Sequence, residues 1–152
     1  MFGFLVNSEE IMKSFEYLEE EATADLAVRS YGATLEEAFV NMALGMMNAM
    51  TPLERVEPKE EREFEVSGGD LGELLYNFLD ELIFMKDVEN LIFSKISVEI
   101  TEDQTKLRAR CWGEPFDLTR HEPKIDVKAV TYSIMEVKKE VDGWTIRTVF
   151  DI

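Results

Sequence analysis

The chain has 152 residues, 45% of them hydrophobic, and one cysteine, Cys111, so it suits a single folded domain over residues 1–152 and excludes an intramolecular disulfide. The formal net charge is −16, and the first 90 residues hold 21 acidic and 6 basic side chains, a charge balance that disfavours unaided binding of RNA or DNA. No apolar run reaches the length of a membrane span and the start lacks the basic flank of a signal peptide, so we expect a cytoplasmic protein with no membrane partner.

The first half of the chain alternates strand patterns with helix patterns. Two capping boxes mark the starts of helices: Thr34 with Glu37, and Asp70 with Glu73. Apolar residues recur at helical spacing after each box. In chain order we predict a lead-in segment at 1–14, strands at 15–18 and 24–31, a helix at 35–50, a charged edge strand at 59–66 and a helix from 71 to at least 83.

The second half is typical of β-structure throughout. Cys111 alternates with apolar residues, which indicates a buried and inert thiol, and Val141-Asp142-Gly143 is a hairpin signal. This order of elements predicts an α+β fold, a two-layer sandwich in which two amphipathic helices pack on one face of a mixed or antiparallel sheet. The expected segments are strands at 91–100 and 107–111, a loop at 113–124, and strands at 127–139 and 144–150.

The best candidate site is the end of the last expected strand. Alternation places Asp151 on the face opposite the apolar residues of that strand, beside the α-carboxylate of Ile152. Asp25 lies on the polar face of its own strand. If the two strands are neighbours, these three groups form an oxygen-rich set that suits Ca²⁺ or Mg²⁺ rather than zinc. The alternative is a solvated acidic strand end.

His121 is the only histidine, and it lies in the loop Arg120-His121-Glu122-Pro123-Lys124. No nucleophile elbow, phosphate-binding loop, dinucleotide fingerprint or zinc spacing accompanies it. We therefore interpret His121 as a structural or partner-contacting residue, and the sequence does not indicate a catalytic centre.

Five short segments stand out in chain order: Ala22-Thr-Ala-Asp25, Gly32-Ala-Thr-Leu-Glu-Glu-Ala-Phe39, Arg120 to Lys124, Val127-Lys-Ala-Val-Thr-Tyr132, and Trp144 to Ile152. In this order they resemble the archease family, and the resemblance covers residues 15–152. Two positions depart from the family pattern, since Ala22 and Ser133 stand where relatives often carry histidine. Any role of those two imidazoles is therefore absent or reassigned here, while the acidic residues are kept.

The resemblance implies a non-enzymatic protein cofactor of the RtcB-type tRNA-splicing ligase, which promotes ligase guanylylation and turnover. It also implies a tRNA cytosine methyltransferase as a second partner, with tRNA contacted only indirectly. The implied metal ligands are Asp25, Asp151 and Ile152, with Ca²⁺ as the first candidate and Mg²⁺ or Mn²⁺ as alternatives. The implied partner-activating residues are Lys128, Asp25, Asp151 and His121.

Two other classes of function stay open at this point. A chaperone-like binding protein for RNA-modifying enzymes would bind RNA or protein without a ligase. A metal-dependent phosphohydrolase would use the same acidic residues to turn over phosphoesters alone, although the sequence offers few ligands for it.

Overall fold

The computed structural model describes residues 14–19 and 25–152, so nearly all of the expected lead-in segment lies outside the described residues. The order of strands and helices confirms the order predicted from sequence. The elements are β1 (Phe15–Leu18), β2 (Asp25–Gly32), α2 (Leu35–Met50), the short 3₁₀ helix η2 (Leu53–Arg55), β3 (Glu60–Ser67), α3 (Leu71–Glu89), β4 (Leu91–Ile100), β5 (Lys106–Pro115), β6 (Ala129–Glu140) and β7 (Gly143–Asp151).

Both helices begin at the predicted capping boxes. The Thr34 hydroxyl accepts a hydrogen bond of 3.1 Å from the Glu37 N–H, and the Glu37 carboxylate accepts one of 3.1 Å from the Ala33 N–H. At α3, the Asp70 carboxylate accepts a bond of 2.8 Å from the Glu73 N–H. The caps satisfy backbone donors that have no partner inside the helix, which fixes where each helix starts.

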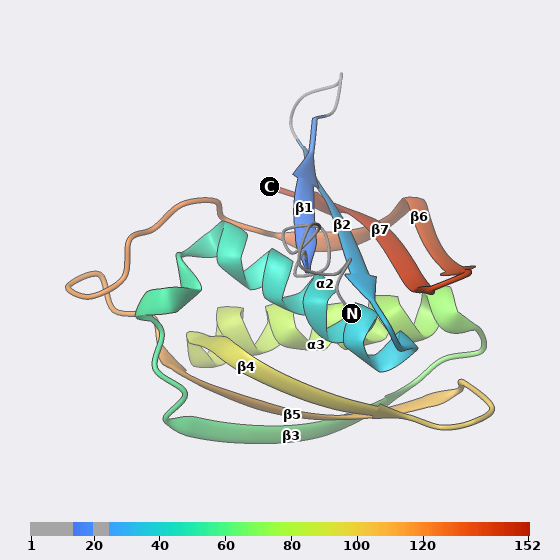
Figure 1. Cartoon of the computed structure of the whole chain (residues 1–152). Helices are drawn as coiled ribbons and strands as arrows, with labels where there is room; N and C mark the ends of the chain where they lie inside the picture. The colour runs from blue at the N-terminus through green and yellow to red at the C-terminus, as the bar shows by residue number, and fades with distance from the viewer. Residues whose placement is uncertain (1–13, 20–24) are drawn as a thin grey trace, which may run out of the picture.

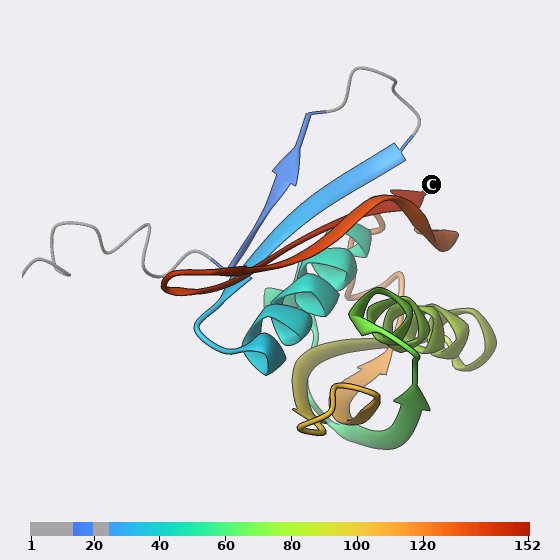
Figure 2. The same cartoon turned by 90° about the vertical axis from the view of Figure 1, so that its right-hand side faces the viewer.

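The described strands form two antiparallel sheets, one in the order β1-β2-β7-β6 and the other in the order β3-β5-β4. Helix α2 contacts β2 and β7 on one side and β4 on the other, while α3 contacts β6 and the second sheet. Figures 1 and 2 show both helices lying between the sheets. The α+β class and the packing of two helices on antiparallel sheets are confirmed.

The layering differs from the predicted single sheet with both helices on one face. Ten of the sixteen residues of α2 are buried, which leaves it without a broad polar face. A helix that is apolar on most sides needs cover from both sides, and the second sheet provides it. The edge position predicted for the strand at 59–66 is confirmed, because β3 is an outer strand of its sheet.

The core fixes the orientation of the last strand. Ile146, Thr148 and Phe150 of β7 are fully buried toward the helices, and β7 lies between β2 and β6. Asp151 follows in the alternation and is exposed. The strand is therefore held along its length while its acidic end faces solvent.

The predicted strand at 127–139 is interrupted in the structure. Thr131 pairs with Val149 and Glu136 pairs with Arg147, so residues 132–135 bulge out opposite a single residue of β7. Ile134 in this bulge has φ of 45°, a left-handed conformation that is unfavourable for a β-branched residue. Alternation of apolar residues gives no sign of such a bulge. No helix in the described part of the chain is long and apolar enough to cross a bilayer.

Candidate carboxylate site at the end of the last strand

Asp25 and Asp151 stand directly opposite each other in the antiparallel pair of β2 and β7. Directly opposed residues point to the same face, with Cβ atoms about 4.5 to 5.5 Å apart. Both side chains are exposed, at the end of the molecule where Figure 1 marks the C-terminus. A shared site for the two carboxylates requires β2 and β7 to be neighbours, and this register places the two side by side.

The charges of this pair are not compensated locally. Neither Asp25 nor Asp151 forms an ion pair or a side-chain hydrogen bond with another described residue. Two carboxylates at this separation repel each other unless a cation or a proton neutralises them. Among the described residues, the two negative charges therefore face solvent without a partner.

The donor set fits a hard divalent cation. The described side chains contain no group of three or more His, Cys, Asp or Glu arranged for a metal. Asp25 and Asp151 offer two side-chain carboxylates, and Ile152, 38% exposed, follows Asp151 directly. Carboxylate oxygens are donors that suit Ca²⁺, Mg²⁺ or Mn²⁺. Water or a partner protein would complete the coordination shell.

Lys128 lies at the same end of the sheet. Its backbone N–H donates a hydrogen bond of 2.8 Å to the carbonyl oxygen of Asp151, and the next residue, Ala129, is the register partner of Asp151. The Lys128 side chain is exposed and makes no ion pair within the described ranges. The structure thus brings three of the predicted site residues together. The departure at Ala22 lies outside the described residues, and the one at Ser133 lies in the β6 bulge.

His121 lies elsewhere, in a buried network within the loop that follows β5. Its Nδ1 accepts a hydrogen bond of 2.9 Å from the Asp117 N–H, so Nε2 carries the proton and donates to Glu114 at 3.0 Å. The imidazole side chain has no exposed surface. Any effect of His121 on a partner must therefore act through the loop that it holds in place.

Glu114 is the centre of this network, and sequence reasoning missed it. Its carboxylate pairs with Arg120 at 2.6 Å and accepts a bond of 2.8 Å from the Glu57 N–H, and Arg120 also reaches the Glu57 carboxylate at 2.9 Å. Arg120 is the main cause that lowers the pKa of Glu114 to about 2. The only sequence signal was the adjacent Arg120-His121 pair, which gave no sign of the partner acid at the end of β5.

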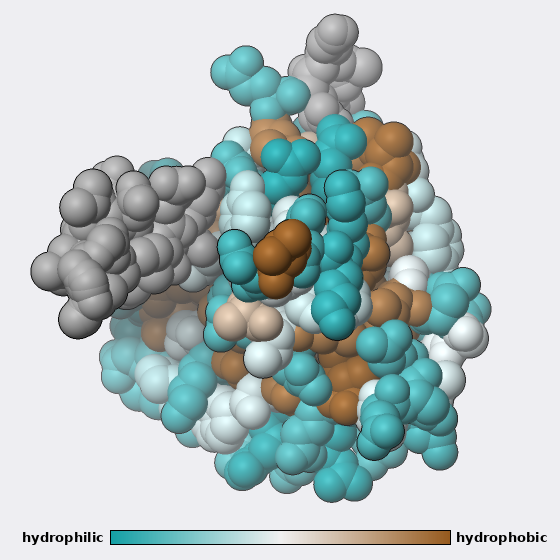
Figure 3. All heavy atoms as spheres, turned by 45° about the vertical axis from the view of Figure 1, so that its right-hand side comes forward, coloured by the Kyte–Doolittle hydropathy of each residue, from teal (hydrophilic) through white to brown (hydrophobic). Residues whose placement is uncertain are grey.

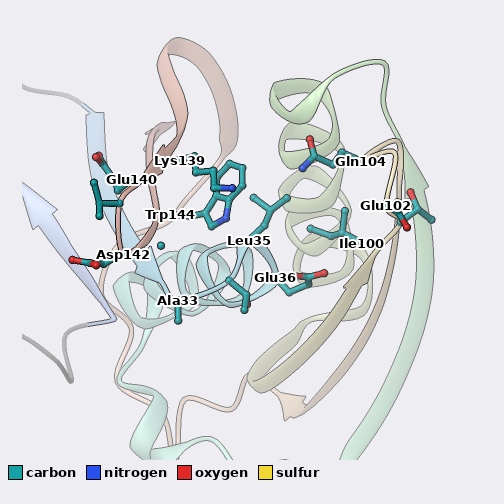
Figure 4. A pocket seen from close by; sticks show the side chains of 14 residues that line it. Ala33, Leu35, Glu36, Ile100, Glu102, Gln104, Lys139, Glu140, Asp142 and Trp144 are labelled. Atoms are coloured by element: carbon teal, nitrogen blue, oxygen red, sulfur yellow. The ribbon is translucent and has the colours of Figure 1, made fainter. Parts of the chain in front are cut away.

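A separate cavity of about 610 Å³ opens at the other end of β7 (Figure 4). Trp144 and Leu35 contribute apolar surface to it, and Lys139 lies over the Trp144 ring with its Nζ 6.0 Å from the ring centroid. Asp151 is at the opposite end of the same strand, so the cavity contributes no ligand to the carboxylate pair.

Comparison with known proteins matches residues 15–152 to the family model described as the Archease protein family (MTH1598/TM1083). Two similar curated proteins, each named Protein archease, come from Thermococcus kodakarensis and Pyrococcus abyssi. They are 46% and 45% identical, and each match covers 93% of this chain and 100% of the relative.

Two solved structures are similar to this one. The solution structure of Methanobacterium thermoautotrophicum protein 1598 has a TM-score of 0.76 and 37% identity, and the match covers 93% of this chain and 100% of that one. The crystal structure of a Thermotoga maritima protein, described as an archease and possible chaperone, has a TM-score of 0.57 and 16% identity over 89% and 96% of the two chains. The second likeness concerns the fold alone.

Proposed function

The chain belongs to the archease family, and from this premise we propose that it is a non-enzymatic activator of an RtcB-type tRNA-splicing ligase that promotes guanylylation and turnover of the ligase. The observation that carries the proposal is the pairing of Asp25 with Asp151 across β2 and β7. An exposed, uncompensated pair of carboxylates can hold a cation, and the backbone of the exposed Lys128 is hydrogen-bonded to Asp151.

In this proposal Asp25, Asp151 and the α-carboxylate of Ile152 hold a divalent cation, with Ca²⁺ as the first candidate and Mg²⁺ or Mn²⁺ as alternatives. When bound, the cation supplies positive charge that neutralises phosphate oxygens at the nucleotide site of the ligase. Lys128 adds a mobile positive charge beside the carboxylates and contacts phosphate or an acidic residue of the partner. His121 acts indirectly, because it and Glu114 fix the loop that leads to Lys128.

The charge of the whole chain supports a protein partner rather than RNA. The net charge is −16, and hydrophilic residues cover much of the described surface in Figure 3. An enzyme that binds tRNA presents basic surface, which an acidic protein complements. The same complementarity would allow docking on a tRNA cytosine methyltransferase, which we propose as a second partner. In that complex the methyltransferase, and not this chain, contacts the tRNA.

A single-turnover guanylylation assay with the purified ligase tests this function. We expect the wild-type chain to accelerate guanylylation. The acceleration by Asp25→Asn and by Asp151→Asn should each be at least about tenfold smaller, because each change removes one charged ligand. Asp142→Asn is the matched control, since Asp142 is an exposed acid in the hairpin turn at the far end of β7. No acceleration by wild type, or full activity of Asp151→Asn, would contradict the proposal. Phosphoester turnover by the chain alone would favour an enzyme instead.

A further inference from the structure

Two stacked tyrosines link α3 and β6, one of them partly buried against the core and the other exposed. The rings of Tyr76 and Tyr132 stack with centroids 4.3 Å apart and planes at 9°, and Tyr132 is still 55% exposed. Burial and the nearby carboxylates of Glu73 and Asp70 raise the pKa of Tyr132. A rigid aromatic surface with acidic neighbours is a frequent anchor in protein interfaces.

Apolar residues continue from Tyr76 along the outer side of α3. Tyr76, Asp80, Phe84 and Val88 follow one another at four-residue spacing, which places them in one row on the helix. Phe84 is 53% exposed and Val88 is 64% exposed, so two large apolar side chains face solvent about one helical turn apart. Figure 2 shows α3 at the outer edge of the helical layer, where the sheets leave one side of it uncovered.

The β6 bulge, which lies next to α3, exposes a further apolar side chain. Ile134 is 56% exposed and holds φ of 45°. The Met135 sulfur lies 3.8 Å from the position that a Cβ would take at Gly72, so the bulge packs against the first turn of α3. A strained backbone that presents an apolar side chain to solvent needs a reason, and contact with a partner provides one.

The charges around these residues identify the kind of partner. The only base of α3, Lys86, is already engaged by Asp87 at 3.1 Å and Asp126 at 3.2 Å. Asp80 and Glu81 form no ion pair with any described residue, so they are free to meet basic groups. Apolar anchors with unpaired acids between them complement a protein surface that has an apolar depression bordered by Lys and Arg.

Helix α3 is also hydrogen-bonded to the segment next to the carboxylate site. Lys86 also donates a hydrogen bond of 2.9 Å to the carbonyl of Val127, one residue before Lys128. Helix α3 therefore lies beside the segment that leads from Lys128 into β6. A partner seated on α3 would have Lys128 and the end of β7 at the margin of its contact area.

We propose that the α3 surface, made of Tyr76, Phe84, Val88, Tyr132 and Ile134, is the docking surface for a protein partner with a basic, apolar-centred patch. The partner is the RNA ligase, and in that respect the inference rests on the proposed function. In this proposal the α3 surface binds the ligase, and the carboxylate site stimulates guanylylation of the bound ligase.

The test compares the equilibrium dissociation constant for the ligase with the maximal guanylylation rate. We expect the double variant Phe84→Ala with Val88→Ala to bind at least about tenfold more weakly, and Tyr132→Ala to bind similarly weakly. At saturating concentration both should still reach the wild-type rate, because the carboxylate site is intact. Asp80→Asn should weaken binding and reduce its dependence on salt. Val141→Ala is the matched control, since Val141 is fully exposed in the hairpin turn between β6 and β7.

The outcomes separate the two proposals. A wild-type chain that stimulates the ligase while the double variant binds it as tightly as wild type would overturn only the α3 docking surface. A wild-type chain that neither binds nor stimulates the ligase would overturn the proposed function and the docking surface together. Because Phe84 and Val88 are exposed, circular dichroism and the unfolding midpoint of the double variant should match wild type, which excludes misfolding as the cause of weak binding.

Discussion

Single acidic residues in this protein fall into two electrostatic classes. Glu114 is buried beside Arg120, which compensates its charge, and beside His121, which donates a hydrogen bond to it. Asp25 and Asp151 are exposed and have no compensating group among the described residues. Compensated charges stabilise the fold, while uncompensated charges that are held together are available for binding.

Glu114 makes stability depend on pH in a defined direction. Its folded-state pKa of about 2 lies below the ordinary value of 4.5, so the stability it contributes is complete above pH 4.5 and is lost as pH falls toward 2. We expect Glu114→Gln to be less stable than wild type near neutral pH by about 1 to 3 kcal/mol. Urea unfolding at about pH 7 and about pH 3 should show that the difference in unfolding free energy between wild type and Glu114→Gln becomes smaller at the lower pH.

The exposed Glu122, in the same loop, provides the control for that measurement. Glu122→Gln should follow the wild-type stability at both pH values. If the difference in unfolding free energy between wild type and Glu114→Gln stays constant from about pH 7 to about pH 3, the ionised Glu114 carboxylate does not stabilise the fold.

The α-carboxylate of Ile152 can be tested by moving it. We expect the addition of two alanines after Ile152 to weaken divalent-ion binding by about tenfold, because the carboxylate is carried away from Asp151. Ile152→Val keeps the carboxylate in place and should bind as wild type does. Titration calorimetry measures both, and unchanged affinity in the extended chain would exclude this carboxylate as a ligand.

At the scale of elements, the pairing of β2 with β7 brings the two carboxylates of the candidate site together. The other sheet depends on close packing of β4 on β5. Gly113 of β5 lies where a Cβ would come within 1.8 Å of the Ile92 carbonyl oxygen of β4. Since that oxygen belongs to the backbone, it cannot move aside cheaply. The second sheet, and with it the support under α2, therefore depends on this glycine.

We expect Gly113→Ala to lower the free energy of unfolding by about 1 to 3 kcal/mol, because the added methyl group forces β4 and β5 apart. Gly69→Ala is the matched control, since a Cβ there meets only the end of the Glu73 side chain at 3.4 Å. Denaturant unfolding of the two variants measures the difference. Equal stability of Gly113→Ala and wild type would show that the sheets adjust to the methyl group without loss.

Local sequence signals predicted those elements that depend on neighbours in the chain. Capping boxes located the starts of α2 and α3, and alternation placed Asp151 away from the core. Alternation could not show that the strands divide into two sheets, because strand partners are chosen by packing at long range. It also missed the β6 bulge, because the bulged segment contains the same kinds of residue as a regular strand. It missed Glu114 because this residue meets Arg120 only in the folded loop.

At the scale of the whole molecule, the main feature is the large and uneven negative charge. We expect no measurable binding to tRNA alone at about 150 mM salt, because a chain of net charge −16 is repelled by a phosphate backbone. Fluorescence anisotropy with labelled tRNA measures this, with the ligase as the positive control. Tight binding that weakens steeply with salt would instead indicate a chaperone-like RNA-binding protein.

We propose above all that the fold brings Asp25 and Asp151 together to hold a divalent cation. Titration calorimetry with Ca²⁺ on wild type, Asp25→Asn, Asp151→Asn and the control Asp142→Asn tests it most directly. We predict saturable binding by wild type and by Asp142→Asn, and affinities at least about tenfold lower for Asp25→Asn and for Asp151→Asn. Equal affinity of all four proteins for Ca²⁺ would contradict the assignment of this site.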